Sequence, residues 1–123
     1  MNIHIHQPTD CIFDVYRESS ILVSTSLFEP FGLVIPEAMS CGLPIVAYNC
    51  PFGPSSILSD GNDGFLIQNN DQRAFADRLC QLMSDGTLRS QMGRAAIISS
   101  CRFEAKQIMP QWKTLFEQPS FSQ

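Results

Sequence analysis

The stretch SLFEPFGLVIPEAMSCGLP, residues 26–44, separates an apolar strand from a short helix and decides how the chain folds. Pro30 has no amide to donate and Gly32 permits a turn that other residues resist, so a strand cannot continue through them. Residues 33–41 are typical of about two helical turns, and Gly42 supplies a left-handed C-terminal cap. The sequence therefore predicts a loop, a short helix and a sharp stop.

The N-terminal end of this predicted helix is a candidate anion site. The amides of Gly32, Leu33 and Val34 would point outward there, where they have no intrahelical partner and the helix dipole favours negative charge. Glu29 and Glu37 lie beside these amides in the sequence. Residue types alone leave two interpretations open. The two acids belong to a ligand site, or they only complement the helix dipole.

Apolar runs on both sides of this stretch predict a parallel sheet. Residues 21–23 (ILV) and 44–48 (PIVAY) are continuous apolar runs, which are typical of parallel strands buried on both faces. Residues 65–67 (FLI) are expected to form a last short strand, and residues 3–7 (IHIHQ) alternate and also suit a strand. Strands that alternate with helices imply right-handed crossovers and an α/β fold.

Helical patterns flank these strands. A helix is expected from a predicted N-cap at Asp10 to about Glu18, and Asp71 is a second predicted N-cap. Thr87 is expected to cap the helix that follows a stop at Asp85-Gly86. The predicted apolar faces are Ile12, Phe13 and Tyr16; Phe75, Leu79, Leu82 and Met83; Leu88, Met92, Ala95 and Ala96; and Ile108, Trp112, Leu115 and Phe116.

Length, composition and charge restrict the class of protein. A chain of 123 residues allows one domain at most; residues 1–117 are expected to form it, with a tail at 118–123. The formal net charge of −4 disfavours nucleic acid and anionic membranes as partners. No apolar run approaches the roughly 20 residues that span a bilayer, and the N-terminus lacks the features of a signal peptide. Five cysteines without a CxxC pair indicate reduced thiols, so a cytoplasmic location is expected.

Two loops are expected to meet at one edge of the sheet. Residues 24–32 follow one predicted strand and residues 49–56 follow the next, and open parallel sheets bind ligands at the carboxyl ends of their strands. This edge suits a polyhydroxylated, phosphorylated ligand, because carboxylates accept hydrogen bonds from hydroxyls and amides donate to phosphate oxygens. No Lys or Arg occurs between Arg17 and Arg73, so the region has acids but no cation.

Other chemistries have little support in the sequence. His4 and His6 would share one face of a strand as a metal pair, but there is no third histidine, and an ordinary surface strand is favoured. The loop GPSS at 53–56 lacks the second glycine of a nucleophile elbow, and no cysteine adjoins a histidine. The absence of a P-loop and of a GxGxxG motif argues against a nucleoside triphosphatase or a dehydrogenase.

The segment EPFGLVIPEAMSCGLPIV, residues 29–46, resembles the E-x7-E signature of the glycosyl transferases group 1, the retaining GT-B enzymes of glycosyltransferase family 4. Residues 14–26, 62–67 and 102–112 are similar to neighbouring parts of that family. The resemblance implies a partial Rossmann-like parallel sheet flanked by helices, with a helical C-terminus. This would be part of the C-terminal nucleotide-sugar-binding domain of a GT-B fold.

The resemblance also implies roles for single residues. Glu29 would approach the donor sugar as the catalytic residue, and the amides of Phe31, Gly32 and Leu33 would contact sugar hydroxyls and phosphate. Glu37 would bind the ribose hydroxyls of the nucleotide. The implied reaction moves a sugar from a nucleotide-diphosphate donor to a glycan or lipid-linked acceptor, with retention of configuration and without a metal cofactor. Catalysis would then depend on stabilising the leaving diphosphate and positioning the acceptor.

Two features depart from the family pattern. Ser56 stands where the family usually has a glutamate. The acceptor-binding N-terminal domain and the leading strands of the donor domain, which bring an Arg and a Lys to the diphosphate, are expected to be absent. Two charge-assisted contacts are worth roughly 1.5–3 kcal/mol each, so the chain alone is expected to be inactive without a missing N-terminal domain or partner chain. The full-length enzyme is also expected to allow peripheral membrane contact.

Two alternatives stay open. A nucleotide-sugar 2-epimerase shares the GT-B fold and donor class, but it is not expected to carry the loop between Glu29 and Glu37. An inactive nucleotide-sugar-binding remnant is favoured by Ser56 and by the truncation. The base, the sugar and the acceptor are not specified by this sequence.

In the family the last helix crosses back toward the other domain, so part of the Ile108 to Phe116 stripe is expected to be exposed.

Overall fold

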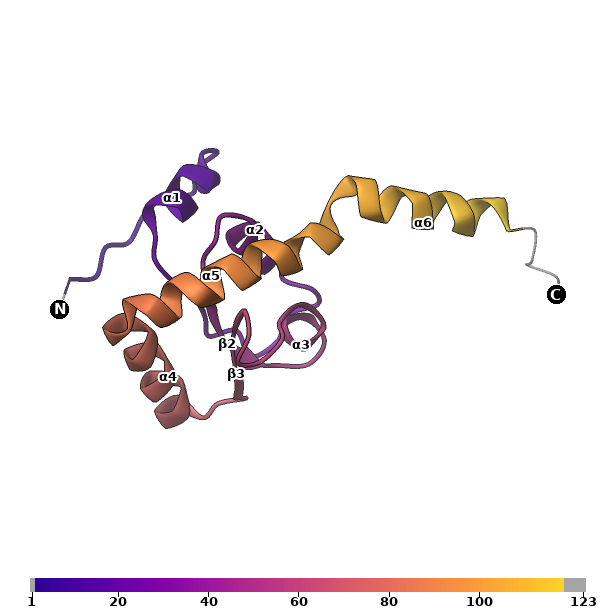
Figure 1. The fold of residues 1–123 in the computed structure, drawn as a ribbon. Helices are drawn as coiled ribbons and strands as arrows, with labels where there is room; N and C mark the ends of the chain where they lie inside the picture. Colours follow the sequence, from indigo (N-terminus) through magenta and orange to yellow (C-terminus); the bar gives the residue numbers. More distant parts are fainter. Residues whose placement is uncertain (1, 119–123) are drawn as a thin grey trace.

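A computed structural model describes residues 2–118 as a parallel three-stranded sheet with helices packed on both faces (Figure 1). The strands are β1 (Leu22–Ser24), β2 (Ile45–Asn49) and β3 (Gly64–Gln68), in the order β1-β2-β3. The helices are α1 (Ile12–Glu18), α2 (Val34–Ser40), α3 (Gly53–Ile57), α4 (Gln72–Ser84), α5 (Gly86–Ser100), the 3-10 turn η1 (Cys101–Phe103) and α6 (Ala105–Glu117). The predicted α/β class with a helical C-terminus is confirmed. The loop that was expected to extend to residue 56 is shorter, because α3 begins at Gly53.

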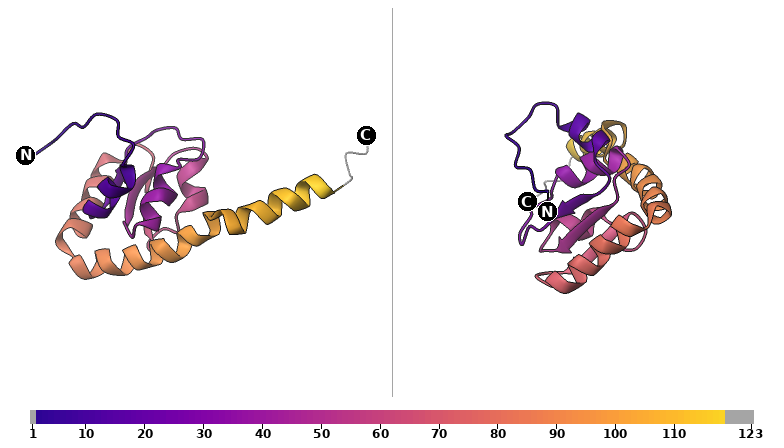
Figure 2. Two further views of the ribbon diagram at one scale, coloured as in Figure 1. Left: turned by 90° about the horizontal axis from the view of Figure 1, so that it is seen from above. Right: turned by 90° about the vertical axis from the view of Figure 1, so that its left-hand side faces the viewer.

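The central strand β2 is buried on both faces, as its apolar run predicts. Ile45 and Ala47 face a core that α1, α2, α3 and α5 share. Val46 and Tyr48 alternate to the other face and pack against β3, α4 and one end of α5. Figure 2 shows the sheet lying between these groups of helices. The sheet is therefore the middle layer, and its carboxyl edge lies where the loops after β1 and β2 begin.

The edge strand β1 is only partly covered. Its apolar run predicts burial on both faces, but Leu22 and Ser24 are half-buried and Val23 is 41% exposed. The strand itself is confirmed, whereas its two-sided burial is wrong. The reason is positional: β1 pairs with β2 on one side only, and no element among residues 2–118 covers the exposed side of Val23.

The N-terminal segment does not form the strand that its alternation predicts. Residues 2–9 have no regular structure, and Ile3 and Ile5 are 69% and 93% exposed. A run this short needs a neighbouring strand for its ladder hydrogen bonds, and none lies beside it in the described part of the chain. Asp10 is not the cap of α1 either. Cys11 takes the N-cap position without a side-chain bond, and the Cys11 amide donates to Thr9 Oγ1 at 3.0 Å.

The helices that follow β3 confirm one predicted cap and correct another. Asp71 accepts a hydrogen bond from the Ala74 amide at 3.0 Å and caps α4 as predicted. The cap of α5 is Asp85, which accepts from the Leu88 amide at 2.9 Å, and not Thr87. A carboxylate two positions earlier caps the helix first, so Thr87 lies inside it.

The predicted apolar faces of α4 and α5 are buried or half-buried except at their margins. Phe75, Leu82, Met92 and Ala96 are buried, while Leu79, Leu88 and Ala95 are half-buried. Met83 is 65% exposed, and Phe13 of α1 is 43% exposed. Both were expected to face inward, but each lies at the edge of its stripe, beyond the reach of the sheet. The N-terminal part of the pattern is correct at Tyr16, which is buried.

The last helix, α6, extends away from the rest of the molecule (Figures 1 and 2). None of its residues is buried, and Trp112, Leu115 and Phe116 are 50%, 54% and 79% exposed. Trp112 stacks on Phe116 with ring centroids 5.8 Å apart. The expectation that part of this apolar stripe is exposed is confirmed within the described residues.

The close contact between α2 and α5 depends on two glycines. Gly42 ends α2 with a φ of +82°, the left-handed cap that the sequence predicts. A Cβ atom on Gly93 would lie 2.3 Å from the carbonyl oxygen of Gly42. The α5 backbone can therefore pack against the end of α2 only because residue 93 has no side chain.

We predict that Gly93→Ala lowers the free energy of unfolding by about 1–3 kcal/mol, because the new methyl group meets backbone and not a flexible side chain. Gly86→Ala is the matched control, since the nearest atom there is the tip of Arg89 at 3.4 Å. It is expected to change stability by less than about 0.5 kcal/mol. Urea denaturation of the two variants and the parent measures both effects. Equal stabilities of the two variants would contradict the proposed packing.

Candidate functional site

The two loops at the carboxyl edge of the sheet are joined by their backbones. Glu29 and Phe52 form a parallel bridge, and the Gly53 amide donates to the Glu29 carbonyl oxygen at 2.9 Å. A Cβ atom on Gly53 would lie 2.4 Å from the carbonyl oxygen of Phe31, so only glycine allows this approach. The prediction that both loops lie at one edge is confirmed. Glu29 is thereby held from both loops.

Gly32 forms the turn between Glu29 and the helix. Its φ is +86°, in the left-handed region that other residues rarely adopt, and it is buried. A Cβ atom there would lie 2.9 Å from the Cγ atom of Glu29, so the Glu29 side chain lies directly against the turn. The Ile35 amide donates to the Gly32 carbonyl at 3.0 Å and starts the helical turn. Glu29 itself is half-buried.

The amides at the start of α2 have no protein partner in the described part of the chain. Within residues 2–118, no backbone or side-chain acceptor takes the amides of Gly32, Leu33 or Val34. Leu33 and Val34 are 66% and 47% exposed. These donors can therefore reach an external acceptor, as the candidate anion site requires.

Glu37 lies one turn into α2 and is contacted from α1. The Tyr16 hydroxyl donates to Glu37 Oε2 at 3.0 Å, and Tyr16 is buried while Glu37 is half-buried. Burial, and then the hydrogen bond and negative charge of Glu37, raise the pKa of Tyr16 to about 12. Tyr16 therefore remains a neutral donor at every physiological pH.

A cavity of about 430 Å³ groups Glu37 with other predicted site residues. Its lining residues are Phe13, Phe31, Leu33, Pro36, Glu37, Ser40, Ser100, Phe103, Glu104 and Ile108. Glu29 and Gly32 do not line it. The structure thus brings the predicted residues together as two groups on either side of the turn: Glu29 with Gly32, and Glu37 with Phe31 and Leu33.

Several residues of the site were not singled out from the sequence. Phe52 has a φ of +76°, and its exposed ring meets the exposed ring of Phe28 edge to face with centroids 6.2 Å apart. Arg102 donates to the carbonyl oxygens of Ser56 and Ile57 at the end of α3. Its guanidinium also lies 4.6 Å from the centroid of the Phe103 ring. The sequence signals for Arg102 are the family resemblance of residues 102–112 and its place near the end of a helix. Neither signal identifies the carbonyls that it contacts.

The hydroxyl of Ser56, at the position where the resemblance predicts a glutamate, forms a local hydrogen bond. It donates to the Phe52 carbonyl oxygen at 3.2 Å within the first turn of α3.

No cation compensates for the acids of the site within residues 2–118. The ion pairs found there are Arg17–Asp14, Lys106–Glu104 and Lys113–Glu117, all on exposed surfaces. The acids Glu29 and Glu37 have no Arg or Lys partner among these pairs.

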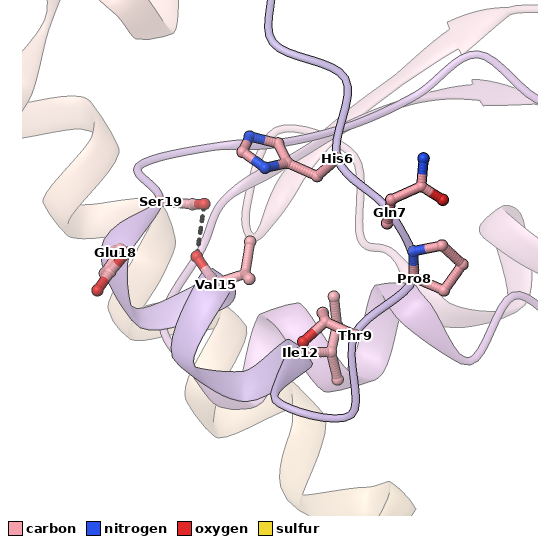
Figure 3. Close-up of a pocket in the computed structure, with 8 residues that line it drawn as sticks. All are labelled: His6, Gln7, Pro8, Thr9, Ile12, Val15, Glu18 and Ser19. Atoms are coloured by element: carbon pink, nitrogen blue, oxygen red, sulfur yellow. Dashed lines mark hydrogen bonds between the residues drawn. The ribbon is translucent and has the colours of Figure 1, made fainter.

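A larger hollow, of about 950 Å³, lies away from these residues. Figure 3 shows it between the N-terminal segment and α1, with His6 to Thr9 on one side and Ile12 and Val15 on the other. It includes none of the predicted site residues.

Within residues 2–118, no group of three His, Cys, Asp or Glu side chains is placed to hold a metal ion. None of the helices in that range combines the length and apolar character needed to cross a membrane.

Comparison with known proteins places this chain in a family. The model of the "Glycosyl transferases group 1" family matches residues 2–98. The chain belongs to this family. Its relatives include an exopolysaccharide phosphotransferase of Streptomyces coelicolor, 38% identical over 100 residues. A poly(ribitol-phosphate) alpha-N-acetylglucosaminyltransferase of Staphylococcus aureus is 33% identical over 112 residues.

These matches cover most of the chain but little of the relatives. They span 81% and 89% of this chain, but only 11% and 22% of the two relatives. Among solved structures, Anabaena HepE in complex with UDP superposes with a TM-score of 0.77 at 30% identity, covering 85% of this chain and 29% of that one. The solved relatives are GT-B glycosyltransferases, so the predicted family and fold are both confirmed.

We predict a loss of stability above pH 10 that depends on Tyr16. The folded-state pKa of about 12 exceeds the ordinary value of 10.0, so folding favours the neutral phenol. Its contribution is complete below pH 10 and is lost as the pH rises toward 12, by up to about 1.4 kcal/mol per pH unit. Urea unfolding at pH 9, 10 and 11 should show a steeper decline for the parent than for Tyr16→Phe. Parallel declines would contradict the assignment.

Proposed function

We propose that this chain carries half of the donor-binding site of a retaining glycosyltransferase. The whole enzyme would move a sugar from a nucleoside-diphosphate sugar to a glycan or lipid-linked acceptor. The observation that carries the proposal is the E-x7-E segment of a group 1 family member at the carboxyl edge of a parallel sheet, with Glu29 and Glu37 on either side of one turn. In that enzyme this chain would form part of the C-terminal, donor-binding domain.

Each group on this turn has a chemical role in the proposal. Glu29 is half-buried and held by Gly32 and Gly53, so its carboxylate offers a fixed acceptor to the hydroxyls of the donor sugar. The amides of Phe31, Gly32 and Leu33 serve the sugar hydroxyls and the diphosphate.

The nucleotide end of the donor is assigned to Glu37. Its half-buried carboxylate borders the 430 Å³ cavity and would accept hydrogen bonds from the ribose hydroxyls. The complex of UDP with the Anabaena relative supports a nucleoside diphosphate as part of the ligand. We propose no metal cofactor. Hydrogen bonds, together with cationic side chains of another domain or a partner chain, would stabilise the leaving diphosphate.

The proposal also requires a second body. The described acids of the site have no cationic partner, so the charge of the diphosphate would be met by residues of another domain or a partner chain. The exposed apolar stripe of α6 supports such a contact, because a monomer rarely leaves a large apolar helix face uncovered. That second body would also bind the acceptor, and peripheral membrane contact would belong to the whole enzyme.

A second candidate function is a nucleotide-sugar-binding remnant without turnover. The observation that favours it is Ser56, whose hydroxyl is already used by the Phe52 carbonyl and cannot replace a carboxylate. Binding with no transfer, even with the remaining domains present, would support this candidate.

We expect UDP to shift the amide signals of residues 31–37 in a ¹H–¹⁵N titration of the chain, with weak affinity. Glu37→Gln should raise the Kd for UDP about tenfold, because a hydrogen bond to a charged group is lost. Glu117→Gln, the same change on exposed α6, is the matched control and should leave the Kd unaltered.

Glu29→Gln separates the two acids of the site. It is expected to leave the Kd for UDP within about twofold, because Glu29 would meet only the sugar, and to abolish any extra affinity of UDP-sugars over UDP. Shifts confined to other parts of the chain, or equal effects of Glu37→Gln and Glu117→Gln, would overturn the donor-site assignment. Sugar transfer by the isolated chain would contradict the half-site proposal.

A further inference from the structure

Tyr16 is the buried residue of α1, and its hydroxyl reaches across to the second acid of the site. The phenol donates to Glu37 Oε2 at 3.0 Å over a separation of 21 residues. The ring belongs to the core cluster that also contains Ile35 and Ala38 of α2. It meets Phe13 edge to face, with ring centroids 5.7 Å apart. The donor is therefore fixed by packing on both of its sides.

We infer that Tyr16 is a positioning residue, which holds one oxygen of Glu37 so that the other accepts hydrogen bonds from the ribose hydroxyls of a nucleoside diphosphate. This inference rests on the proposed function of Glu37 as the ribose-binding carboxylate. Tyr16 itself does not contact the ligand. It acts by restricting where the carboxylate points.

The physical reason lies in the freedom of a glutamate side chain. Glu37 is half-buried and carries no salt bridge among the described residues, so a free carboxylate there would sample several rotamers. Ordering those rotamers on binding costs free energy that a fixed donor removes in advance. A buried tyrosine suits this task, because a phenol keeps its proton at physiological pH and packing fixes the ring that carries it.

The hydroxyl is not needed to fill space. A phenylalanine at position 16 would keep the ring in the cluster with α2 and the contact with Phe13. Tyr48 provides a matched control, because it is the other tyrosine, is 6% exposed, and packs on Phe75 across the sheet from α2. Tyr16→Phe and Tyr48→Phe remove the same atom from two buried rings, but only one of those atoms contacts Glu37.

The test compares UDP with 2′,3′-dideoxyuridine 5′-diphosphate by ¹H–¹⁵N titration of the parent chain, Tyr16→Phe, Tyr48→Phe and Glu37→Gln. The Kd for the dideoxy analogue divided by the Kd for UDP measures what the ribose hydroxyls contribute to affinity. We expect Tyr16→Phe to reduce this ratio by about five- to tenfold, since the loss of a charged hydrogen bond is of that order. Tyr48→Phe should leave the ratio unchanged, and the Kd for the dideoxy analogue should be the same in all four proteins.

The outcomes separate this inference from the proposed function. If Glu37→Gln lowers the ratio but Tyr16→Phe does not, Tyr16 has no positioning role and the inference fails alone. A purely structural role would weaken both ligands by the same factor in Tyr16→Phe, which also overturns the inference. If the parent chain binds neither ligand, or does not distinguish them, the proposed function of Glu37 fails and the inference fails with it.

Discussion

The hydrogen bond from the Gly53 amide to the Glu29 carbonyl oxygen is the contact on which the candidate site depends. It joins the loop after β1 to the loop after β2, at the edge where a parallel sheet exposes its carboxyl ends. Because residue 53 has no side chain, the backbones approach closely enough for this bond and for the neighbouring turn at Gly32. Glu29, at the junction, is held by backbone geometry and needs no side-chain partner to keep its place.

Helix α2 carries the other half of the site and is fixed from behind. Its buried face packs on β2, its C-terminal cap at Gly42 receives α5 at Gly93, and its Glu37 carboxylate receives the Tyr16 hydroxyl from α1. Arg102 holds the end of α3 in a similar way by capping its last carbonyls. These contacts hold α2, and with it the amides at its start and the cavity beside Glu37, in one position, which suits a ligand-binding turn. The described residues supply acids and amides, but no cation, to that turn.

Local chemistry made some features predictable. Gly42 as a left-handed cap, Asp71 as an N-cap and the burial of β2 on both faces follow from residue type and pattern alone. The wrong predictions are those in which a contact with another part of the chain determines the structure. The alternating residues 3–7 lack a neighbouring strand, and Val23 lacks a covering element. At the start of α5, the Asp85 side chain and not that of Thr87 accepts the hydrogen bond from the Leu88 amide.

Residues 29–37 by themselves specified the turn, the two acids and, through the family signature, the family to which the chain belongs. Glycine, proline and the helix period act over a few residues, so the chain order contains all that they need. Tertiary structure alone decided that Glu29 joins the loop of Gly53, that Glu37 is met by Tyr16, and that Glu29 and Glu37 fall into separate groups on either side of Gly32. The two hydrogen bonds, from Gly53 to Glu29 and from Tyr16 to Glu37, connect residues more than 20 positions apart. Only tertiary packing brings these residues within hydrogen-bonding distance.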